Sequence, residues 1–466
     1  EMQRSLVGSE MCIRDRIESS GAIFLCYRSG EYMEQRSCMG KFAHYTILSV
    51  LGTLGVSCYI LADTFYVSKG LGTNGLTVLN LAIPVYNFIH GTGLMLGMGG
   101  ATRFSVCKSQ KRAEEVNRIY TNTIYLGLIF SVLFVLSGFI FSNQLAILLG
   151  ADASVLEMTD TYLRWLLLFS PAFILNDVLL CFVRNDGSPQ LSMAAMLIGS
   201  FSNIILDYIF IFPLRMGIFG AVFATGLSPV ISIVMMLPHW LRRKNTFYFV
   251  RTGIRKDIIK QEIVLGFPSL IAQLSSGIVM ITFNAIILRL AGNTGVAAYG
   301  VIANISLVIV AVFTGIAQGI QPLVSTFYGM GNNRQARTVL RYAIVTMLTV
   351  SVIVYFLIFV LAQPITEAFN SENNMELERI AIIGLRQYFI SIPFVGYNII
   401  LATFFTSIEK ALPAHILSIL RGLLLIIPMA FFLSALWGMT GVWLAYPITE
   451  ALTALLGCLY FIFTLY

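Results

Sequence analysis

Charged residues are scarce in this chain of 466 residues. Aspartate, glutamate, lysine and arginine together make up 11% of it, whereas 57% of the residues are hydrophobic. Because a water-soluble domain carries about 25% charged residues, this chain lacks the polar surface that it would need in water. The shortage excludes a soluble enzyme or a secreted domain and favours an integral membrane protein.

Residues that build metal and disulfide sites are also few. The chain has seven cysteines without a CxxC pair and four histidines without an HExxH motif. Neither a disulfide framework nor a zinc site is therefore indicated. We expect no cofactor and no resident metal, and we do not expect an enzyme, since a membrane-embedded enzyme needs a paired nucleophile and base or a metal cluster.

Long apolar stretches are abundant. From His44 onward they alternate with short polar turns, and each is long enough to cross a bilayer. The pattern predicts twelve transmembrane helices, over residues 44–66, 76–100, 119–141, 160–183, 191–213, 219–241, 262–288, 296–326, 338–362, 380–407, 413–434 and 438–463.

Lysine and arginine gather in the loops that follow the even-numbered predicted spans. These loops hold Lys108, Lys111, Arg112, Arg118, Arg184, Arg334, Arg337, Arg341, Lys410 and the seven basic residues of the segment 242–260. Since cytoplasmic loops retain positive charge, we expect a multi-pass protein of the cell (inner) membrane with both termini in the cytoplasm. The net charge of +7 then sets orientation, and nucleic-acid binding is not indicated.

The chain divides into two similar halves. We expect a poorly ordered or non-native tail over 1–40, an N-terminal lobe over 41–241, a cytoplasmic linker over 242–260 and a C-terminal lobe over 261–466. The sequence LGTNG at 71–75 is matched by AGNTG at 291–295, and both copies enter the membrane from the same side. The predicted fold is an all-α integral membrane protein of two pseudo-symmetric six-helix bundles.

Small residues and prolines recur within the spans. Gly93 and Gly97 have the GxxxG spacing that permits close helix packing. Six prolines at 84, 171, 268, 322, 393 and 447 lie inside predicted spans, where proline bends a helix for gating or for ordinary packing.

Ionisable residues inside spans mark functional sites by default, because burying one costs about 2.5–3.5 kcal/mol. The strongest candidates are Asp63 and Asp207, with Asp177, Glu450 and His90 as accessory candidates. Asn203 and Asp207 are four residues apart on one helix face, and Thr225 on the next span adds a hydroxyl. Two carboxylates in one apolar site are suited to bind and release a proton. Alternatively, Asp207 simply hydrogen-bonds Asn203, and Asp177 is a solvated helix-end charge.

Several motifs resemble those of multidrug and toxin extrusion (MATE) transporters. They are ADTFYV at 62–67, RNDGSP at 184–189, FSNIILD at 201–207, GIQP at 319–322 and YGMGN at 328–332. The resemblance extends from Lys41 to the C-terminus and is closer to the DinF-like and MepA-like branch than to the NorM-like branch. It implies a secondary active antiporter that exports small organic, mostly cationic compounds in exchange for H⁺ or Na⁺ by alternating access.

The resemblance also implies a cation-coupling site at Asp63, Asn203, Asp207 and Thr225. The NorM-like branch has a glutamate at the place of Ser276, which disfavours coupling through the second lobe. Many relatives have asparagine at the place of Ile60, so a proton relay is favoured over a full sodium shell. In the internal repeat, the counterpart of Asp63 is Phe283 or Asn284, and neither side chain ionises.

An adaptable cavity for bulky cations uses methionine, aromatic and amide side chains. The residues expected to line it are Tyr59, Asn87, Met95, Met193, Met196, Gln318 and Gln321. We expect a monomer in the lipid bilayer. The main alternative function is a flippase for a lipid-linked precursor, from the same superfamily, and a channel is a further alternative.

Overall fold

The computed structural model describes the backbone of residues 2–369 and 374–465, and side chains from Cys38 onward apart from residues 368 and 464–465. The described residues fold into helices without a strand. In the first half these are α1 (Met2–Ser109), α2 (Ala113–Leu148), α3 (Leu156–Leu168), α4 (Ser170–Asn185), α5 (Pro189–Ile211), α6 (Gly217–Met236) and α7 (Pro238–Leu241). In the second half they are α8 (Lys256–Gly329), α9 (Asn333–Phe369), α10 (Met375–Tyr388), the 3₁₀ turn η1 (Phe389–Ser391), α11 (Ile392–Ser407), α12 (Ala411–Ile419), the π turn η2 (Leu420–Leu424), α13 (Ile426–Trp437) and α14 (Met439–Leu465).

Twelve spans follow from these helices. Nine continuous helical segments of the described chain are long and apolar enough to cross a membrane, and the pair α3 and α4, bent by 45°, makes a tenth. The helices α1 and α8 each hold two spans, because their backbone leaves the helical region at Gly72 (φ 67°, ψ −155°) and Gly292 (φ 61°, ψ −157°). Glycine is required at these turns, since a Cβ clashes with the backbone at such angles. The prediction of twelve transmembrane helices is thereby confirmed.

The internal repeat is visible in the backbone. Residues with positive φ recur 220 to 222 positions apart in the two halves. The matched pairs are Gly72 with Gly292, Lys111 with Gly331, Gly187 with Glu409, and Gly217 with Gly438. The same spacing relates Pro171, at the break between α3 and α4, to Pro393, at the break between η1 and α11. The two lobes therefore share turns and helix breaks as well as helix number.

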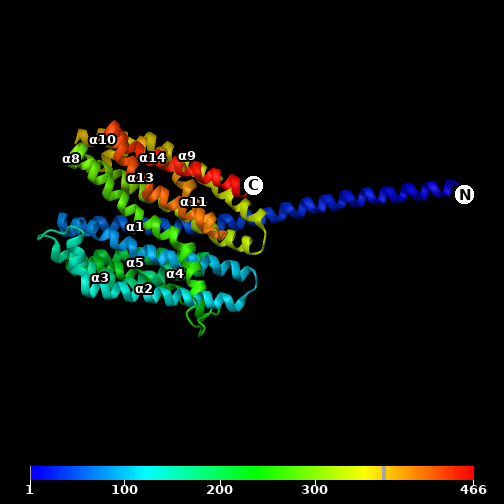
Figure 1. Cartoon of the computed structure of the whole chain (residues 1–466), viewed down its shortest axis with the longest axis horizontal. Coiled ribbons are helices and arrows are strands. Elements are labelled where there is room, and N and C mark those ends of the chain that lie inside the picture. Colours follow the sequence, from blue (N-terminus) through cyan, green and yellow to red (C-terminus); the bar gives the residue numbers. More distant parts are fainter. Residues whose placement is uncertain (1, 370–373, 466) are drawn as a thin grey trace.

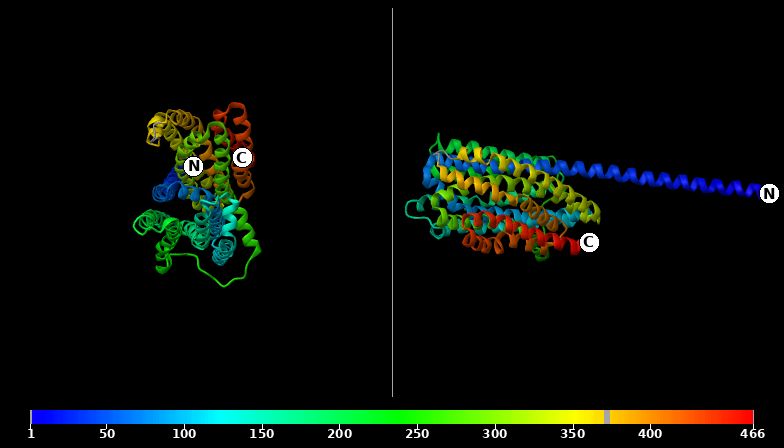
Figure 2. Two further views of the ribbon diagram at one scale, coloured as in Figure 1. Left: turned by 90° about the vertical axis from the view of Figure 1, so that its left-hand side faces the viewer. Right: turned by 90° about the horizontal axis from the view of Figure 1, so that it is seen from above.

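Each lobe has its own apolar core. One cluster of buried side chains draws on α1–α6 together with Phe247 of the linker and Ile258 of α8, and a second, larger one draws almost entirely on α8–α14. Figures 1 and 2 show the two helix groups side by side, with the first part of α1 extending away from them. The expectation that residues 1–40 form a separate, poorly ordered tail stays a prediction.

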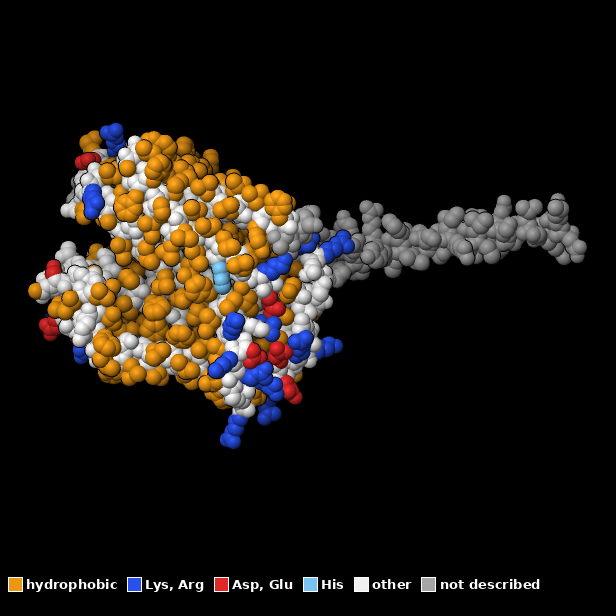
Figure 3. All heavy atoms as spheres, viewed as in Figure 1, with side chains coloured by type: hydrophobic (Ala, Val, Ile, Leu, Met, Phe, Trp, Pro, Cys, Tyr) orange, Lys and Arg blue, Asp and Glu red, His pale blue; other side chains and the backbone are white. Residues whose placement is uncertain are grey.

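Hydrophobic side chains cover the long sides of the molecule, and charged side chains gather at its ends (Figure 3). The end that carries the loops at Lys111, Arg243, Gly331 and Lys410 is called the basic end below. At the opposite end, a hydrogen bond from Ser154 lowers the pKa of the exposed Asp152 carboxyl, so this loop stays negatively charged. The predicted separation of charge between the two ends is therefore present.

The segment between α7 and α8 is bound to the N-terminal lobe. The side chain of Asp186, in the turn before α5, is fully covered. It accepts hydrogen bonds from Lys108 and from the backbone and side chain of Thr246, and it lies 2.9 Å from His239 Nε2. Further along, side chains of α2 accept hydrogen bonds from the backbone N–H groups of Tyr248, Val250 and Arg255. The linker is thus held along one lobe by its own backbone.

The two lobes meet closely at the basic end. A Cβ on Gly266 of α8 would lie 1.8 Å from the Met95 carbonyl oxygen of α1, and one on Gly319 would lie 2.7 Å from Thr46 Cα. Glycine at these two positions is what allows the helix backbones to touch. At the other end, the surface is notched between the lobes (Figure 3).

Polar side chains reinforce this interlobe contact. Arg103 donates to Glu409 at 2.6 Å, and Arg184 donates to Gln318 at 2.7 Å. The amide of Gln321 accepts from Asn185 and donates to Thr102. Each of these bonds joins a residue of the N-terminal lobe to one of the C-terminal lobe, so the lobes are closed against each other at the basic end.

Candidate cation-coupling site

The four residues expected to couple a cation come from three packed helices of one lobe. Asp63 lies in α1, Asn203 and Asp207 lie one turn apart in α5, and Thr225 lies in α6. Asn203, Asp207 and Thr225 are buried, with exposed fractions of 0%, 0% and 4%. Asp63 acts electrostatically on Asp207, so the two carboxylates share one environment.

Most polar atoms of this cluster have no partner. Asp63 Oδ1, both side-chain atoms of Asn203 and both carboxylate oxygens of Asp207 are buried without a hydrogen bond to any described residue. The alternative that Asp207 simply hydrogen-bonds Asn203 is therefore wrong. Buried polar groups are nearly always satisfied in folded proteins, so five such atoms in one place make this cluster a candidate binding site.

The hydroxyl of Thr225 does not donate to a carboxylate. Its hydroxyl donates to the Ala221 carbonyl oxygen one turn earlier, at 3.0 Å. The buried hydroxyl of Tyr162 in α3 interacts with Thr225 and is influenced electrostatically by both Asp63 and Asp207. Tyr162 is thus a fifth member of the site, which the sequence did not single out.

The two accessory candidates of the N-terminal lobe form a pair. His90 Nδ1 lies 2.8 Å from Asp177 Oδ2. Asp177 is 5% exposed and is not the solvated helix-end charge that the alternative interpretation assumed. A Cβ on Gly93 would lie 2.6 Å from Asp177 Oδ2, and one on Gly97 would lie 3.0 Å from the Asp177 carbonyl oxygen. The predicted close packing at this GxxxG pair is confirmed, and α4 is the helix that uses it.

The accessory candidate of the C-terminal lobe is fully paired. Glu450 of α14 accepts from Arg421 Nε at 3.0 Å and Nη2 at 2.9 Å through Oε1, and from Asn398 Nδ2 at 2.6 Å through Oε2. Arg421 belongs to the π turn η2, where the Leu425 N–H bonds the Leu420 carbonyl oxygen. This carboxylate is satisfied by its own lobe.

The residues expected to line a substrate cavity lie in several environments. Tyr59 is buried, and its hydroxyl oxygen lies 2.7 Å from that of Tyr86. Asn87 donates to Ser276 of the other lobe at 3.3 Å. Met95, Gln318 and Gln321 take part in the interlobe contact at the basic end, whereas Met193 and Met196 are half-buried on α5. Their role in binding a substrate stays a prediction.

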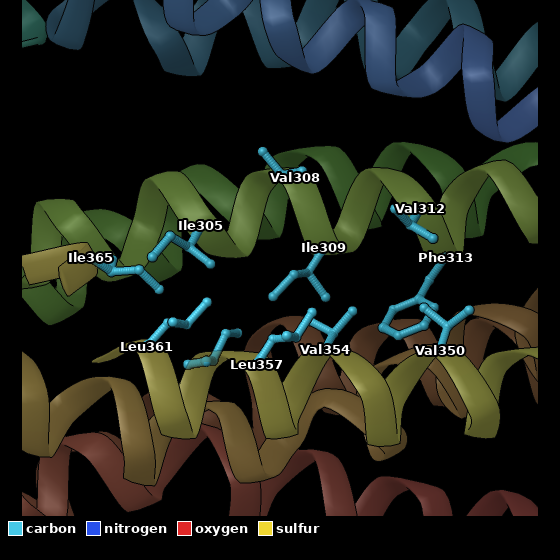
Figure 4. Close-up of a pocket in the computed structure, with 11 residues that line it drawn as sticks. Ile305, Val308, Ile309, Val312, Phe313, Val350, Val354, Leu357, Leu361 and Ile365 are labelled. Atoms are coloured by element: carbon cyan, nitrogen blue, oxygen red, sulfur yellow. The ribbon is translucent and has the colours of Figure 1, made fainter. Parts of the chain in front are cut away.

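A groove elsewhere in the molecule is unsuited to an ion. It has a volume of about 260 Å³ and lies between α8 and α9 (Figure 4). Its lining is aliphatic apart from Phe313 and consists of Ile305, Val308, Ile309, Val312, Phe313, Val350, Val354, Leu357, Ile358, Leu361 and Ile365. With no polar side chain in the lining, the groove offers a cation no ligand.

The sequence did not single out two further charged residues, the half-buried Arg421 and the buried Glu262. Arg421 lies inside a predicted span, and a charged residue there is enough to mark a buried charge. Its partner could not be predicted, because it depends on the packing of α14. Glu262 of α8 is 0% exposed and accepts from Thr123 of α2 at 3.0 Å. It begins a predicted span, so its burial against the other lobe had no sequence signal.

Comparison with known proteins agrees with this architecture. The model of the MatE family matches residues 49–209 and 268–432. The multidrug export protein MepA of Staphylococcus saprophyticus is 25% identical over 435 residues, which cover 92% of this chain and 94% of MepA. MepA of Staphylococcus aureus strain MSSA476 is 25% identical over 433 residues, with the same coverage.

Solved structures show the same fold. A multidrug resistance MATE transporter of the MOP superfamily in an outward-facing conformation superimposes with a TM-score of 0.85 at 25% identity, covering 90% of this chain and 94% of that one. A MATE structure in complex with MaL6 gives 0.85 at 26% identity with the same coverage. The chain therefore belongs to the MatE family of multidrug and toxin extrusion transporters.

Proposed function

We propose that this protein is a secondary active antiporter that exports organic, mostly cationic compounds in exchange for H⁺ or Na⁺. The observation that carries the proposal is the cluster of buried, unpartnered polar atoms on Asp63, Asn203 and Asp207. Burying such groups costs about 1–3 kcal/mol each when nothing satisfies them. A cation that binds there and leaves again offsets this cost in one state of the cycle.

The donor set suits either coupling ion. Asp63, Asn203, Asp207 and Thr225 present side-chain oxygens from three helices, and oxygen is the ligand that hard cations prefer. Two carboxylates in mutual electrostatic contact also suit a single shared proton. Ile60 lies three residues before Asp63 on the same helix, and its side chain has no oxygen to bind sodium, which favours the proton as coupling ion.

The way the lobes meet supports alternating access. The bonds Arg103–Glu409 and Arg184–Gln318, together with the glycine contacts, close the basic end, while the surface is notched at the other end. The distribution of lysine and arginine favours a cytoplasmic location for the basic end. In that orientation, this conformation is closed to the cytoplasm. The two termini are then cytoplasmic, and the protein acts as a monomer in the cell membrane.

The cation must favour one conformation over the other to drive export, because a ligand shifts an equilibrium only by its differential affinity. We infer that deprotonated Asp63 and Asp207 favour the state that holds the substrate. Protonation from outside then favours the state that releases it.

The test is ethidium efflux from proteoliposomes under separately imposed proton and sodium gradients. We expect the wild-type protein to respond to at least one gradient and Asp207→Asn to respond to neither. Tyr208→Phe is the matched control, because Tyr208 is next in the chain but 53% exposed on the outer face of α5. Gradient-driven efflux by Asp207→Asn at the wild-type rate would refute the assignment of the coupling site.

A further inference from the structure

The His90–Asp177 pair is distinct from the coupling cluster and lies beside the contact between α1 and the other lobe. On the same helix as His90, Asn87 contacts Ser276 of α8, and a Cβ on Gly91 would lie 3.0 Å from Leu270 and 3.1 Å from Gln273. The His90 side chain is 25% exposed, whereas that of Asp177 is 6% exposed. Within this pair, the imidazole is therefore accessible to solvent, whereas the carboxylate is buried.

The groups around His90 are few. From α4, Asp177 is the charged residue that acts on the ring. From its own helix, the Tyr86 ring stacks on it with centroids 5.9 Å apart and planes 15° apart. The neighbouring turns of α8 contribute the uncharged Gln273 and Ser276, and α2 contributes Phe134 against Phe88. A positive charge on His90 is thus balanced by Asp177 alone.

A pair of tyrosines joins this site to the coupling cluster. The hydroxyl oxygens of Tyr59 and Tyr86 are 2.7 Å apart. Both tyrosines are influenced electrostatically by Asp177 and by Asp63. Tyr59 is also one turn from Asp63 on α1, which places both side chains on the same helix face. The tyrosine pair is therefore close enough to both carboxylates to couple the two sites electrostatically.

We propose that His90 and Asp177 form a second proton-binding site, and that an organic cation entering between the lobes displaces its proton. The inference rests on the proposed antiport and adds a second group through which substrate and proton exchange. With His90 protonated, the imidazolium neutralises Asp177. When the cation approaches, the proton leaves the ring for water between the lobes, and the Asp177 carboxylate becomes the counter-ion of the substrate.

The residues suit this exchange chemically. Histidine is the side chain whose ordinary titration falls between pH 5 and 8, so its proton is available at physiological pH. Two cations repel each other within a few ångströms, and a fixed imidazolium therefore opposes an organic cation. The rings of Tyr86 and Phe173, which meet edge to face with centroids 5.8 Å apart beside Asp177, offer faces that attract a cation.

The experiment measures proton release on binding. The full chain in detergent is titrated with tetraphenylphosphonium in weak buffer containing a pH indicator. Because this cation carries no titratable proton, every proton released comes from the protein. We expect His90→Gln to release up to about one proton fewer per ligand bound than the wild-type protein between about pH 5.5 and 7.5. His44→Gln is the matched control, since His44 is an exposed histidine of α1, and it is expected to release as many as wild type.

An unchanged release by a His90→Gln variant that still binds the cation overturns the proposal. If that variant does not fold, the native chain labelled with ¹⁵N-histidine decides instead. Addition of tetraphenylphosphonium at about pH 6 must then convert the His90 imidazolium signal to the neutral form. An unaltered signal at saturating ligand also overturns the proposal.

The same assay separates this inference from the proposed function. Asp207→Asn keeps the His90-dependent part of proton release if the second site is independent, while its gradient-driven efflux is lost. Tyr86→Phe keeps the ring stack but removes the hydroxyl, and we expect it to retain proton release and to lose part of the coupling to transport. Efflux by Asp207→Asn at the wild-type rate refutes the coupling site and leaves the His90 result to be judged by its own titration.

Discussion

The two lobes have the same scaffold but treat buried charge in opposite ways. In the N-terminal lobe, the Asp207 oxygens accept no hydrogen bond from the described residues. In the C-terminal lobe, Glu450 accepts three from Arg421 and Asn398. Counted from the paired turns Gly217 and Gly438, Tyr446 takes the place of Thr225, and Glu450 lies one turn farther along α14.

We interpret this difference as one between a site suited to exchange and a site that stabilises its lobe. A carboxylate that already has a guanidinium partner is not stabilised further by a second cation. A buried carboxylate without a partner is stabilised strongly when a cation binds. Because the duplicated helices tolerate both arrangements, one lobe is free to carry the coupling and the other to remain rigid.

The largest expected effect comes from removing the carboxylate of Asp63, which has no ionisable counterpart in the C-terminal lobe. Asp63→Asn should lower gradient-driven efflux by about 5- to 150-fold, the range that corresponds to a coupling free energy of about 1–3 kcal/mol. Phe283→Leu alters the counterpart of Asp63 in the C-terminal lobe and should leave the ion dependence unchanged. Efflux assays on both variants test the comparison directly, and equal losses would end the assignment of coupling to one lobe.

The second effect concerns stability. Glu450→Gln leaves the Arg421 guanidinium without its counter-ion, and breaking a buried pair in this way costs about 3–5 kcal/mol. Thermal unfolding in detergent should therefore show a large drop for Glu450→Gln and a smaller one for the double variant Arg421→Met with Glu450→Gln. If the double variant is as unstable as the single one, the pair is not what stabilises the C-terminal lobe.

The third effect should be the same in both lobes. Gly72→Ala and Gly292→Ala place a Cβ where φ is above 60°, which costs about 1–3 kcal/mol of conformational strain. Gly300→Ala is the control, because no atom lies within 4 Å of its added Cβ and its backbone is helical. Unequal destabilisation of the two turn variants would show that the repeat is not equivalent at these turns.

The smallest effect concerns the contact between the lobes. Arg103→Gln removes the ion pair with Glu409, and partly exposed pairs of this kind contribute about 0.2–1 kcal/mol. We expect Cys107, which is buried one turn away, to react about 2- to 5-fold faster with a thiol reagent. Arg118→Gln, whose partner Glu114 lies on the same helix, should leave the Cys107 rate unchanged.

The fold was predictable from the sequence because its signals are local. Apolar length gave the spans, the basic loops gave the separation of charge between the two ends, and the LGTNG and AGNTG segments marked the two turns that the structure places at Gly72 and Gly292. The positions of Asp63 and Asp207 were equally accessible, since an acid within a span stands out.

The partners of the buried charges were not predictable. Whether Asp207 is bonded to Asn203 depends on rotamers, and whether Asp177 meets His90 depends on how closely α4 approaches α1 at Gly93. Tyr162 gave no signal, because tyrosine is common in membrane helices and its role arises only from the approach of α3 to α6. Such contacts join residues far apart in the chain, and periodicity carries no information about them.

The sequence suggests that residues 242–260 form a free linker between the lobes, but the structure binds this segment to the N-terminal lobe. The hydrogen bonds from Thr246, Tyr248, Val250 and Arg255 to Asp186 and to the side chains of α2 bind it to the N-terminal lobe. The first turns of α8 are fastened to the same lobe, since Ile258 packs in its core and Glu262 accepts a hydrogen bond from Thr123. We therefore expect the linker to move with the N-terminal lobe, and any rocking between the lobes to be absorbed within α8, beyond Glu262, by bending of the helix.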